Sequence, residues 1–266
     1  MLRDITLGQY YQTDSIIHKL DPRVKLVSTL VFIVSLFVVD NFIGYLLATI
    51  YLAIIIKLSN VPVKFIFRGM KSIVFLLLIT VIFNLFLTPG TALVSFWKLT
   101  ITYEGLKFAS LMAVRLILLI TGSTIMTLTT TPNTLTDGLE KLMSPLKKFH
   151  VPVHEISMMM SIALRFIPIL LEETDKIMKA QMARCADFES GSIMKRAKAL
   201  VPLLVPLFIS AFRRANDLAM AMEARCYRGG DGRTKMKPLI YQNIDRIAYL
   251  IILLYFVLCI IIGRIF

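Results

Sequence analysis

Long apolar runs, separated by short polar or basic stretches, constrain the fold of this chain more than any other feature. The runs are Leu26–Val39, Phe42–Ile56, Ile73–Leu87, Leu106–Leu128 and Ile247–Ile262. A helix needs roughly 20 apolar residues to cross a hydrocarbon core of about 30 Å. The first two runs are shorter, and Asp40-Asn41 between them predicts a tight hairpin whose polar ends reach the interfaces. The pattern predicts an all-α, polytopic membrane protein with about five transmembrane helices.

Charge is unevenly distributed along the chain and predicts its orientation. The 266 residues are 57% hydrophobic and only 18% charged, yet the formal net charge is +13. The basic excess lies at 57–71 and 141–246, and Lys/Arg-rich segments between spans favour the cytoplasm. We therefore expect an N-terminal transmembrane domain of four spans at 1–128, with a cytoplasmic N-terminus. A cytoplasmic helical domain follows at 129–246, and the last transmembrane helix lies at 247–266, in a multi-pass protein of the cell membrane.

A short motif occurs twice in the basic region. The first copy is Ala183-Arg184-Cys185, and the second is Ala224-Arg225-Cys226. Each copy ends a pattern of helical periodicity, over 155–185 and 195–226 respectively. Cations at helix C-termini are stabilised by the helix dipole, which is one explanation of the two arginines. Small residues beside a guanidinium that can grip a carboxylate with two hydrogen bonds favour a second explanation, contact with a partner protein.

Other candidate sites are weaker. Arg115 lies inside the fourth predicted span, where a charge commonly marks function. We favour a structural pair with Glu104 or Asn84. Methionines gather on the two long helices, where core packing and an adaptable contact surface are equally good explanations. These methionines are Met158, Met159, Met160, Met178, Met182, Met220 and Met222.

Several classes of function lack the residues that they need. The chain has no phosphate-binding G-x-x-x-x-G-K-[ST] sequence, so we expect no ATP bound to it. His150 and His154 flank Pro152 without an obvious third ligand, so we expect no metal. No arrangement of nucleophile and base indicates an enzyme. The basic helices also carry acidic residues and no aromatic platform, so we expect no nucleic-acid partner.

The sequence resembles the transmembrane T component of energy-coupling factor (ECF) transporters, which are importers of the ABC type. The resemblance covers nearly the whole chain. The matching segments are His18–Arg23, Thr130–Pro132, Ala163–Pro168, the two motifs and the tail 227–234. The family's usual motif is Ala-Arg-Gly, and here Cys185 and Cys226 stand in the third place. Because cysteine carries a side chain, we expect no left-handed helix cap at these two positions.

The resemblance implies a non-catalytic scaffold that holds no cofactor of its own. In similar proteins the motif arginines dock on two cytoplasmic ATPase subunits, which bind ATP and Mg²⁺. The docking residues would be Ala183, Arg184, Cys185, Ala224, Arg225 and Cys226. A substrate-binding S component, reoriented by ATP hydrolysis, would release a vitamin or other micronutrient inside the cell. The alternative is a conventional ABC-type permease subunit that binds its own substrate, which would need polar residues along several spans.

Overall fold

The computed structural model describes residues 10–96, 99–186, 188, 192–230, 232, 234, 236 and 238–265. The chain folds into two compact units. The membrane unit contains residues 8–141 and 239–266, and the helical arm contains residues 1–7 and 142–238. The membrane unit contains α1 (Ile16–Lys19), α2 (Pro22–Val38), α3 (Phe42–Ser59), α4 (Val63–Leu87), β1 (Ala92–Phe96), β2 (Leu99–Thr102), α5 (Tyr103–Thr129), most of α6 (Pro132–Leu142) and α9 (Asn243–Ile265).

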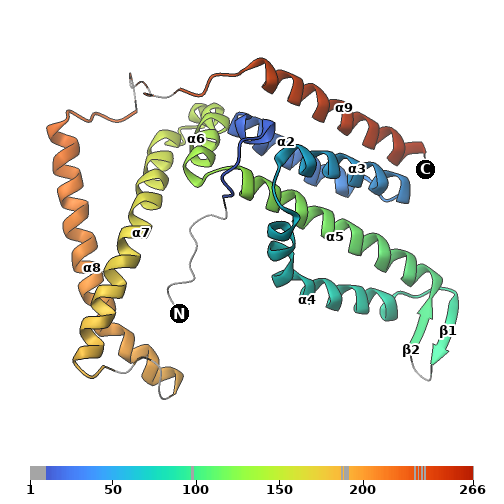
Figure 1. Ribbon diagram of the computed structural model, residues 1–266, viewed down its shortest axis with the longest axis horizontal. Coiled ribbons are helices and arrows are strands. Elements are labelled where there is room, and N and C mark those ends of the chain that lie inside the picture. Colours follow the sequence, from blue (N-terminus) through green and yellow to red (C-terminus); the bar gives the residue numbers. More distant parts are fainter. Residues whose placement is uncertain are drawn as a thin grey trace. The chain divides into compact units, whose positions relative to one another are not determined.

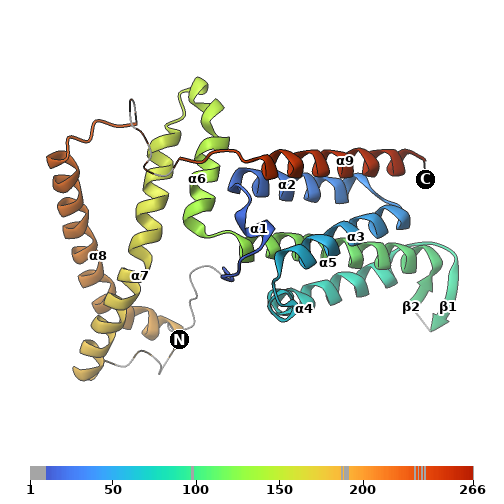
Figure 2. The same ribbon diagram turned by 45° about the horizontal axis from the view of Figure 1, so that its top comes forward.

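Among the described residues, the core of the membrane unit is formed by side chains of α2, α3, α4, α5 and α9. Figures 1 and 2 both show α9 lying along α2, and α5 packs against α2, α3 and α4. Aromatic rings from three of these helices meet at the centre: Tyr51 stacks on Tyr255 with 4.1 Å between ring centroids, and Phe32 lies beside both. Close packing of this kind holds helices together in a bilayer, where lipid is as apolar as the side chains and burial from water contributes little.

The predicted spans agree with the structure in most places. By length and composition, α3, α5 and α9 can each cross a membrane, and the two parts of α4 count as one further span with a bend of 63°. The first predicted run, Leu26–Val39, lies in α2 and its C-cap Val39; α2 has 17 residues and is shorter than any of these spans. In the helical arm, α7 (Val153–Ala183) is also long and apolar enough to cross a membrane, although the sequence predicted this helix in the cytoplasm.

The segment that connects α4 to α5 lies between two of the predicted spans. It forms an antiparallel hairpin of the two short strands β1 and β2, so the fold is helical with one small sheet. Glu104, in the first turn of α5, accepts a hydrogen bond of 2.7 Å from the backbone N–H of Thr91. Thr102 caps α5 by accepting a hydrogen bond from the N–H of Gly105.

A buried polar cluster ties the start of α2 to the start of α9. Asp245 is 2% exposed, and its carboxylate accepts hydrogen bonds from the N–H groups of Asp21 (2.9 Å) and Gln242 (2.7 Å). Arg23 donates to the carbonyl of Leu239 at 2.7 Å. A buried carboxylate is costly unless it is paired or hydrogen-bonded, and here both of its oxygens are satisfied. The segment 18–23 therefore joins two helices that are far apart in the sequence.

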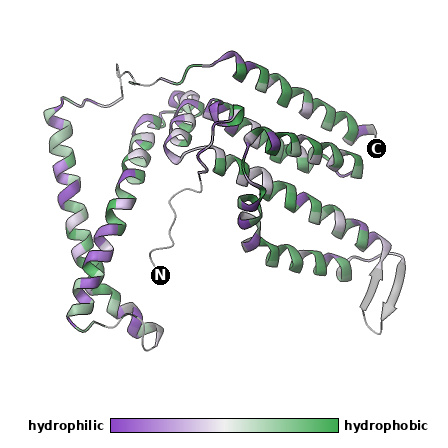
Figure 3. Ribbon diagram, viewed as in Figure 1, coloured by the Kyte–Doolittle hydropathy of each residue, from purple (hydrophilic) through white to green (hydrophobic). Residues whose placement is uncertain are grey.

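The helical arm contains the 3₁₀ helix η2 (Ser144–Phe149), α7 and α8 (Ile193–Ala224). The segment between α5 and α7 contains α6 and η2. Pro145 lies in the first turn of η2, where the backbone N–H that proline lacks would have no carbonyl partner within the helix. The two long helices begin and end within two residues of the predicted 155–185 and 195–226. Polar and apolar residues alternate along α7 and α8, whereas α3 and α9 are predominantly apolar (Figure 3).

Candidate functional site

The first candidate docking end is the C-terminus of α7. Arg184 is the C-cap of this helix, with φ −92° and ψ 18°. Cys185 follows with φ 64°, in the left-handed region. Its N–H donates to the carbonyl of Met182 at 3.0 Å, and the N–H of Ala186 donates to the carbonyl of Gln181 at 3.0 Å. These two bonds form a Schellman motif, which satisfies carbonyls that a helix end otherwise leaves without donors.

The second candidate docking end, at the C-terminus of α8, repeats this geometry. Arg225 is the C-cap, with φ −92° and ψ 14°. Cys226 has φ 56°. Its N–H donates to the carbonyl of Glu223 at 2.8 Å, and the N–H of Tyr227 donates to the carbonyl of Met222 at 3.0 Å. The sequence duplication is therefore also a duplication of backbone conformation.

The expectation that cysteine would prevent a left-handed cap was wrong. Both cysteines occupy the C′ position of a Schellman motif, where glycine is the usual residue. The left-handed conformation costs a residue with a Cβ roughly 1–2 kcal/mol, and two backbone hydrogen bonds at each end offset this cost. Satisfaction of the helix carbonyls thus outweighs the local preference of the side chain.

The motif residues are exposed at both ends. Ala183, Arg184 and Cys185 are all exposed, and so are their counterparts 224–226. In the described part of the chain, neither motif arginine forms an ion pair. Each end therefore presents an exposed guanidinium between small side chains, which permits close approach of another surface and a bidentate bond to a carboxylate. In Figure 1 the two helices cross, and their C-terminal ends lie at opposite ends of the pair.

An ion pair at this crossing was not predicted. Arg214 of α8 donates to the carboxylate of Glu173 of α7 at 2.6 Å. Near the end of α7, the amide of Gln181 donates to the carbonyl of Pro202 at 3.5 Å. Glu173 and Arg214 are 41 residues apart in the sequence, and only the crossing brings them together. This contact joins α7 to α8 at their crossing.

Arg115 has different partners from those predicted. Its guanidinium donates to the hydroxyl of Tyr45 and to the carboxylate of Asp40, both at 2.6 Å, rather than to Glu104 or Asn84. The amide of Asn84 donates to a carbonyl of its own helix. Arg115 therefore holds α5 to the turn between α2 and α3. Both polar groups of the predicted spans are bonded within the chain, so neither supports a substrate path of a conventional permease.

For four of the methionines on α7 and α8, the structure distinguishes core packing from an exposed contact surface. Met159, Met160, Met182 and Met220 are exposed on α7 and α8. These four do not pack in the core of the helical arm, which favours the contact-surface interpretation for them. Asp231 and Arg233 belong to the tail 227–234 that contributes to the family resemblance, and both lie outside the described residues. Among the described residues, no group of three or more His, Cys, Asp or Glu could hold a metal ion.

The fold and the two exposed helix ends define a class: a helical multi-pass membrane protein with a helical arm suited to contact other proteins. Comparison with known proteins makes this specific. A family model described as cobalt transport protein, CbiQ, matches residues 13–236. The energy-coupling factor transporter transmembrane protein EcfT of Clostridium kluyveri is 57% identical over 252 residues, which cover 94% of this chain and 93% of that protein.

Other EcfT proteins are also similar to this chain over nearly its whole length. EcfT of Ruminiclostridium cellulolyticum is 54% identical over 245 residues, or 92% of both chains. EcfT of Lactococcus lactis subsp. cremoris is 44% identical over 265 residues, covering 99% of this chain and 100% of that protein. The chain belongs to the EcfT family, the transmembrane components of energy-coupling factor transporters. It is a non-catalytic, multi-pass membrane component of such a transporter, as the resemblance predicted.

Proposed function

We propose that the chain is a scaffold that couples two cytoplasmic ATPase subunits to a substrate-binding S component during uptake of a micronutrient. In this proposal, residues 1–128 and 247–266 lie in the membrane and residues 129–246 form a cytoplasmic coupling domain. ATP and Mg²⁺ bind the ATPases and not this chain. Family membership supports the general role, and the helical arm supports the assignment of particular residues.

The observation that carries the residue assignment is the pair of matching helix ends. Two similar partners require two similar contact sites on one chain, and the ends at Arg184 and Arg225 have the same cap, the same hydrogen bonds and the same exposure. We assign Ala183, Arg184 and Cys185 to one ATPase, and the second copy of the motif to the other. The arginine would bind a carboxylate in each partner, and the small neighbours would let the helix end approach closely.

The exposed methionines on α7 and α8 fit the S component in this scheme. Unbranched, polarisable side chains adapt to partners of different shape. Met159 and Met160 of α7 and Met220 of α8 are candidates for this contact.

Charge reversal tests the docking assignment. Arg184→Glu and Arg225→Glu should each weaken co-purification of the ATPases with the full transporter and reduce uptake in proteoliposomes. A buried contact of one charged pair typically changes binding by 2–5 kcal/mol when one partner is removed. Arg213→Glu is the matched control, because this exposed arginine lies on α8 away from its end. Unchanged complex and unchanged uptake in both motif variants would contradict the proposal.

A further inference from the structure

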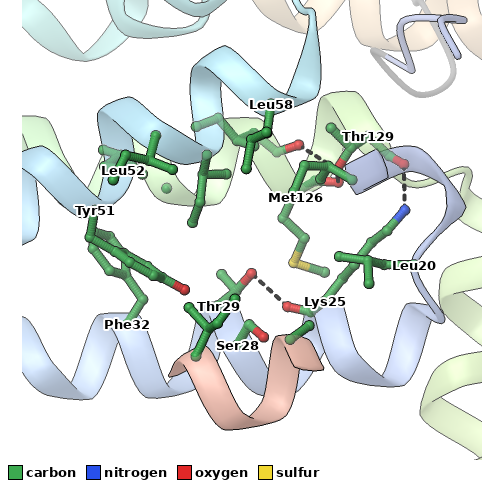
Figure 4. A pocket seen from close by; sticks show the side chains of 17 residues that line it. Leu20, Lys25, Ser28, Thr29, Phe32, Tyr51, Leu52, Leu58, Met126 and Thr129 are labelled. Carbon is green, nitrogen blue, oxygen red and sulfur yellow. Dashed lines mark hydrogen bonds between the residues drawn. The ribbon is translucent and has the colours of Figure 1, made fainter. Parts of the chain in front are cut away.

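The membrane unit contains a cavity that the proposed coupling role does not use. Its volume is about 230 Å³, and it lies among α1, α2, α3, α5 and α9. Figure 4 shows the side chains that line it, with the rings of Phe32 and Tyr51 at one end and Leu20 and Lys25 at the other. Most of the lining is aliphatic or aromatic. Such a cavity selects an apolar ligand, and its size is below the roughly 300–1,000 Å³ of pockets for drug-sized molecules. It therefore suits a slender group, such as part of one hydrocarbon chain.

The apolar side chains at the rim indicate where this ligand comes from. Ile54 and Leu58 of α3 and Ile251 of α9 line the cavity and are 53%, 43% and 49% exposed. Both helices are long and apolar enough to cross a membrane. In a bilayer such exposed side chains contact lipid, because hydrocarbon replaces water there. The rim thus adjoins the acyl region of the membrane.

A single ammonium group lies at the polar end of the cavity. Lys25 is 8% exposed, and its Nζ donates to the carbonyls of Thr129 at 2.9 Å and His18 at 3.1 Å. An ammonium has three N–H donors, so these two carbonyls leave one. In the part of the chain that the structure describes, no carboxylate forms an ion pair with it. Two further exposed cations, Lys19 and Lys57, are next in the sequence to the lining residues Leu20 and Leu58, at the C-terminal ends of α1 and α3.

We propose that this cavity binds one acyl chain of an anionic phospholipid, with the headgroup phosphate at the end formed by Lys25. The apolar lining receives the chain from the side where Ile54, Leu58 and Ile251 are exposed. The ammonium of Lys25 complements the negative phosphate, and the exposed Lys19 and Lys57 add positive charge next in sequence to the lining residues Leu20 and Leu58. Cations near a membrane surface attract anionic lipid by about 1 kcal/mol each, which corresponds to roughly fivefold in preference. The site would therefore discriminate between headgroups as well as hold a chain.

Native mass spectrometry tests the lipid site. The full chain is reconstituted with equal amounts of phosphatidylglycerol and phosphatidylcholine, and retained lipid is then counted. Ala248→Phe places a ring in the cavity, since Ala248 lines it. Leu250→Phe is the matched control, because Leu250 lies on the same helix, is exposed and does not line the cavity. Lys25→Gln keeps two N–H donors for the carbonyls but removes the charge.

The proposal makes three separate expectations. The unaltered chain should retain one phosphatidylglycerol in preference to phosphatidylcholine. Ala248→Phe should lose bound lipid by fivefold or more while Leu250→Phe retains it. Lys25→Gln should still bind a lipid but with a preference about fivefold lower; if that variant does not fold, the exposed double variant Lys19→Gln/Lys57→Gln should lower the preference instead. Equal retention of the two lipids by the unaltered chain, or undiminished retention by Ala248→Phe, would overturn the proposal.

Discussion

Replacement of Cys226 by glycine should stabilise the C-terminal end of α8. Cys226 has φ 56°, and a residue with a Cβ loses roughly 1–2 kcal/mol in this conformation. Glycine removes that strain but has more freedom when the helix end frays, which costs roughly 0.5–1 kcal/mol. Taking the middle of each range, the net gain is about 0.75 kcal/mol. A free-energy change of this size corresponds to a roughly two- to fivefold shift of the local opening equilibrium.

Amide hydrogen exchange of the full chain in lipid nanodiscs measures this opening directly. The two N–H groups that form the cap, those of Cys226 and Tyr227, donate to the carbonyls of Glu223 and Met222. Both should exchange two to five times more slowly in Cys226→Gly. The same change at Cys185 should protect the equivalent amides at the end of α7.

Two further variants separate backbone strain from loss of the thiol. Cys226→Ala keeps a Cβ and should exchange like the unaltered chain, whereas Cys226→Val should exchange faster, because a β-branched residue is disfavoured at positive φ. If the alanine variant exchanged as slowly as the glycine variant, the reasoning would be refuted, because loss of the sulfur and not relief of backbone strain would then cause the effect. Unchanged exchange in Cys226→Gly would refute it as well.

Three other predictions concern contacts between segments. Glu173→Ala removes the ion pair at the crossing of α7 and α8, so the distribution of distances between spin labels on the two exposed cysteines should broaden. The charge swap Glu173→Arg/Arg214→Glu should restore the narrow distribution. An unchanged distribution in Glu173→Ala would show that the ion pair does not set the crossing. Asp245→Ala leaves two backbone N–H groups without their acceptor, at about 1–3 kcal/mol each, so thermal unfolding in detergent should occur at a clearly lower temperature than for the exposed control Asp217→Ala. Burial lowers the pKa of His18 below its usual 6.5, so the neutral histidine stabilises the folded state above pH 6.5, and this stabilisation is lost as the pH falls through the folded pKa. Hydrogen exchange over residues 10–20 should therefore accelerate on acidification. The variant His18→Gln should remove this pH dependence, and a dependence that persists would show that another group is responsible.

The duplicated motif illustrates how far the sequence predicts the candidate site. Its helical periodicity placed both helix ends within two residues, and the residue types indicated a contact with a partner. The sign of φ at Cys185 and Cys226 was predicted wrongly, because side-chain preference was weighed without the two hydrogen bonds that complete each cap. Those bonds depend on the conformation of the whole helix end and not on one residue.

Arg115 shows a second limit. A charge in an apolar run predicts that a partner exists, because an unpaired charge in a membrane is costly. It does not say which partner, and the nearest polar residues in sequence were the wrong choice. Asp40 and Tyr45 lie about 70 residues away, on the turn and helix against which α5 packs.

What the sequence determined by itself is the class of the protein, four of its five predicted spans, the two long helices of the arm and the positions of the two motif arginines. Hydropathy and helical periodicity are properties of neighbouring residues, so they can be read without knowing which segments meet. The tertiary structure alone decided the bond between Asp21 and Asp245, the ion pair that joins α7 to α8, and the cavity among five helices. Each of these depends on segments brought together from distant parts of the chain, and the free energy of such a contact exists only once the helices have packed.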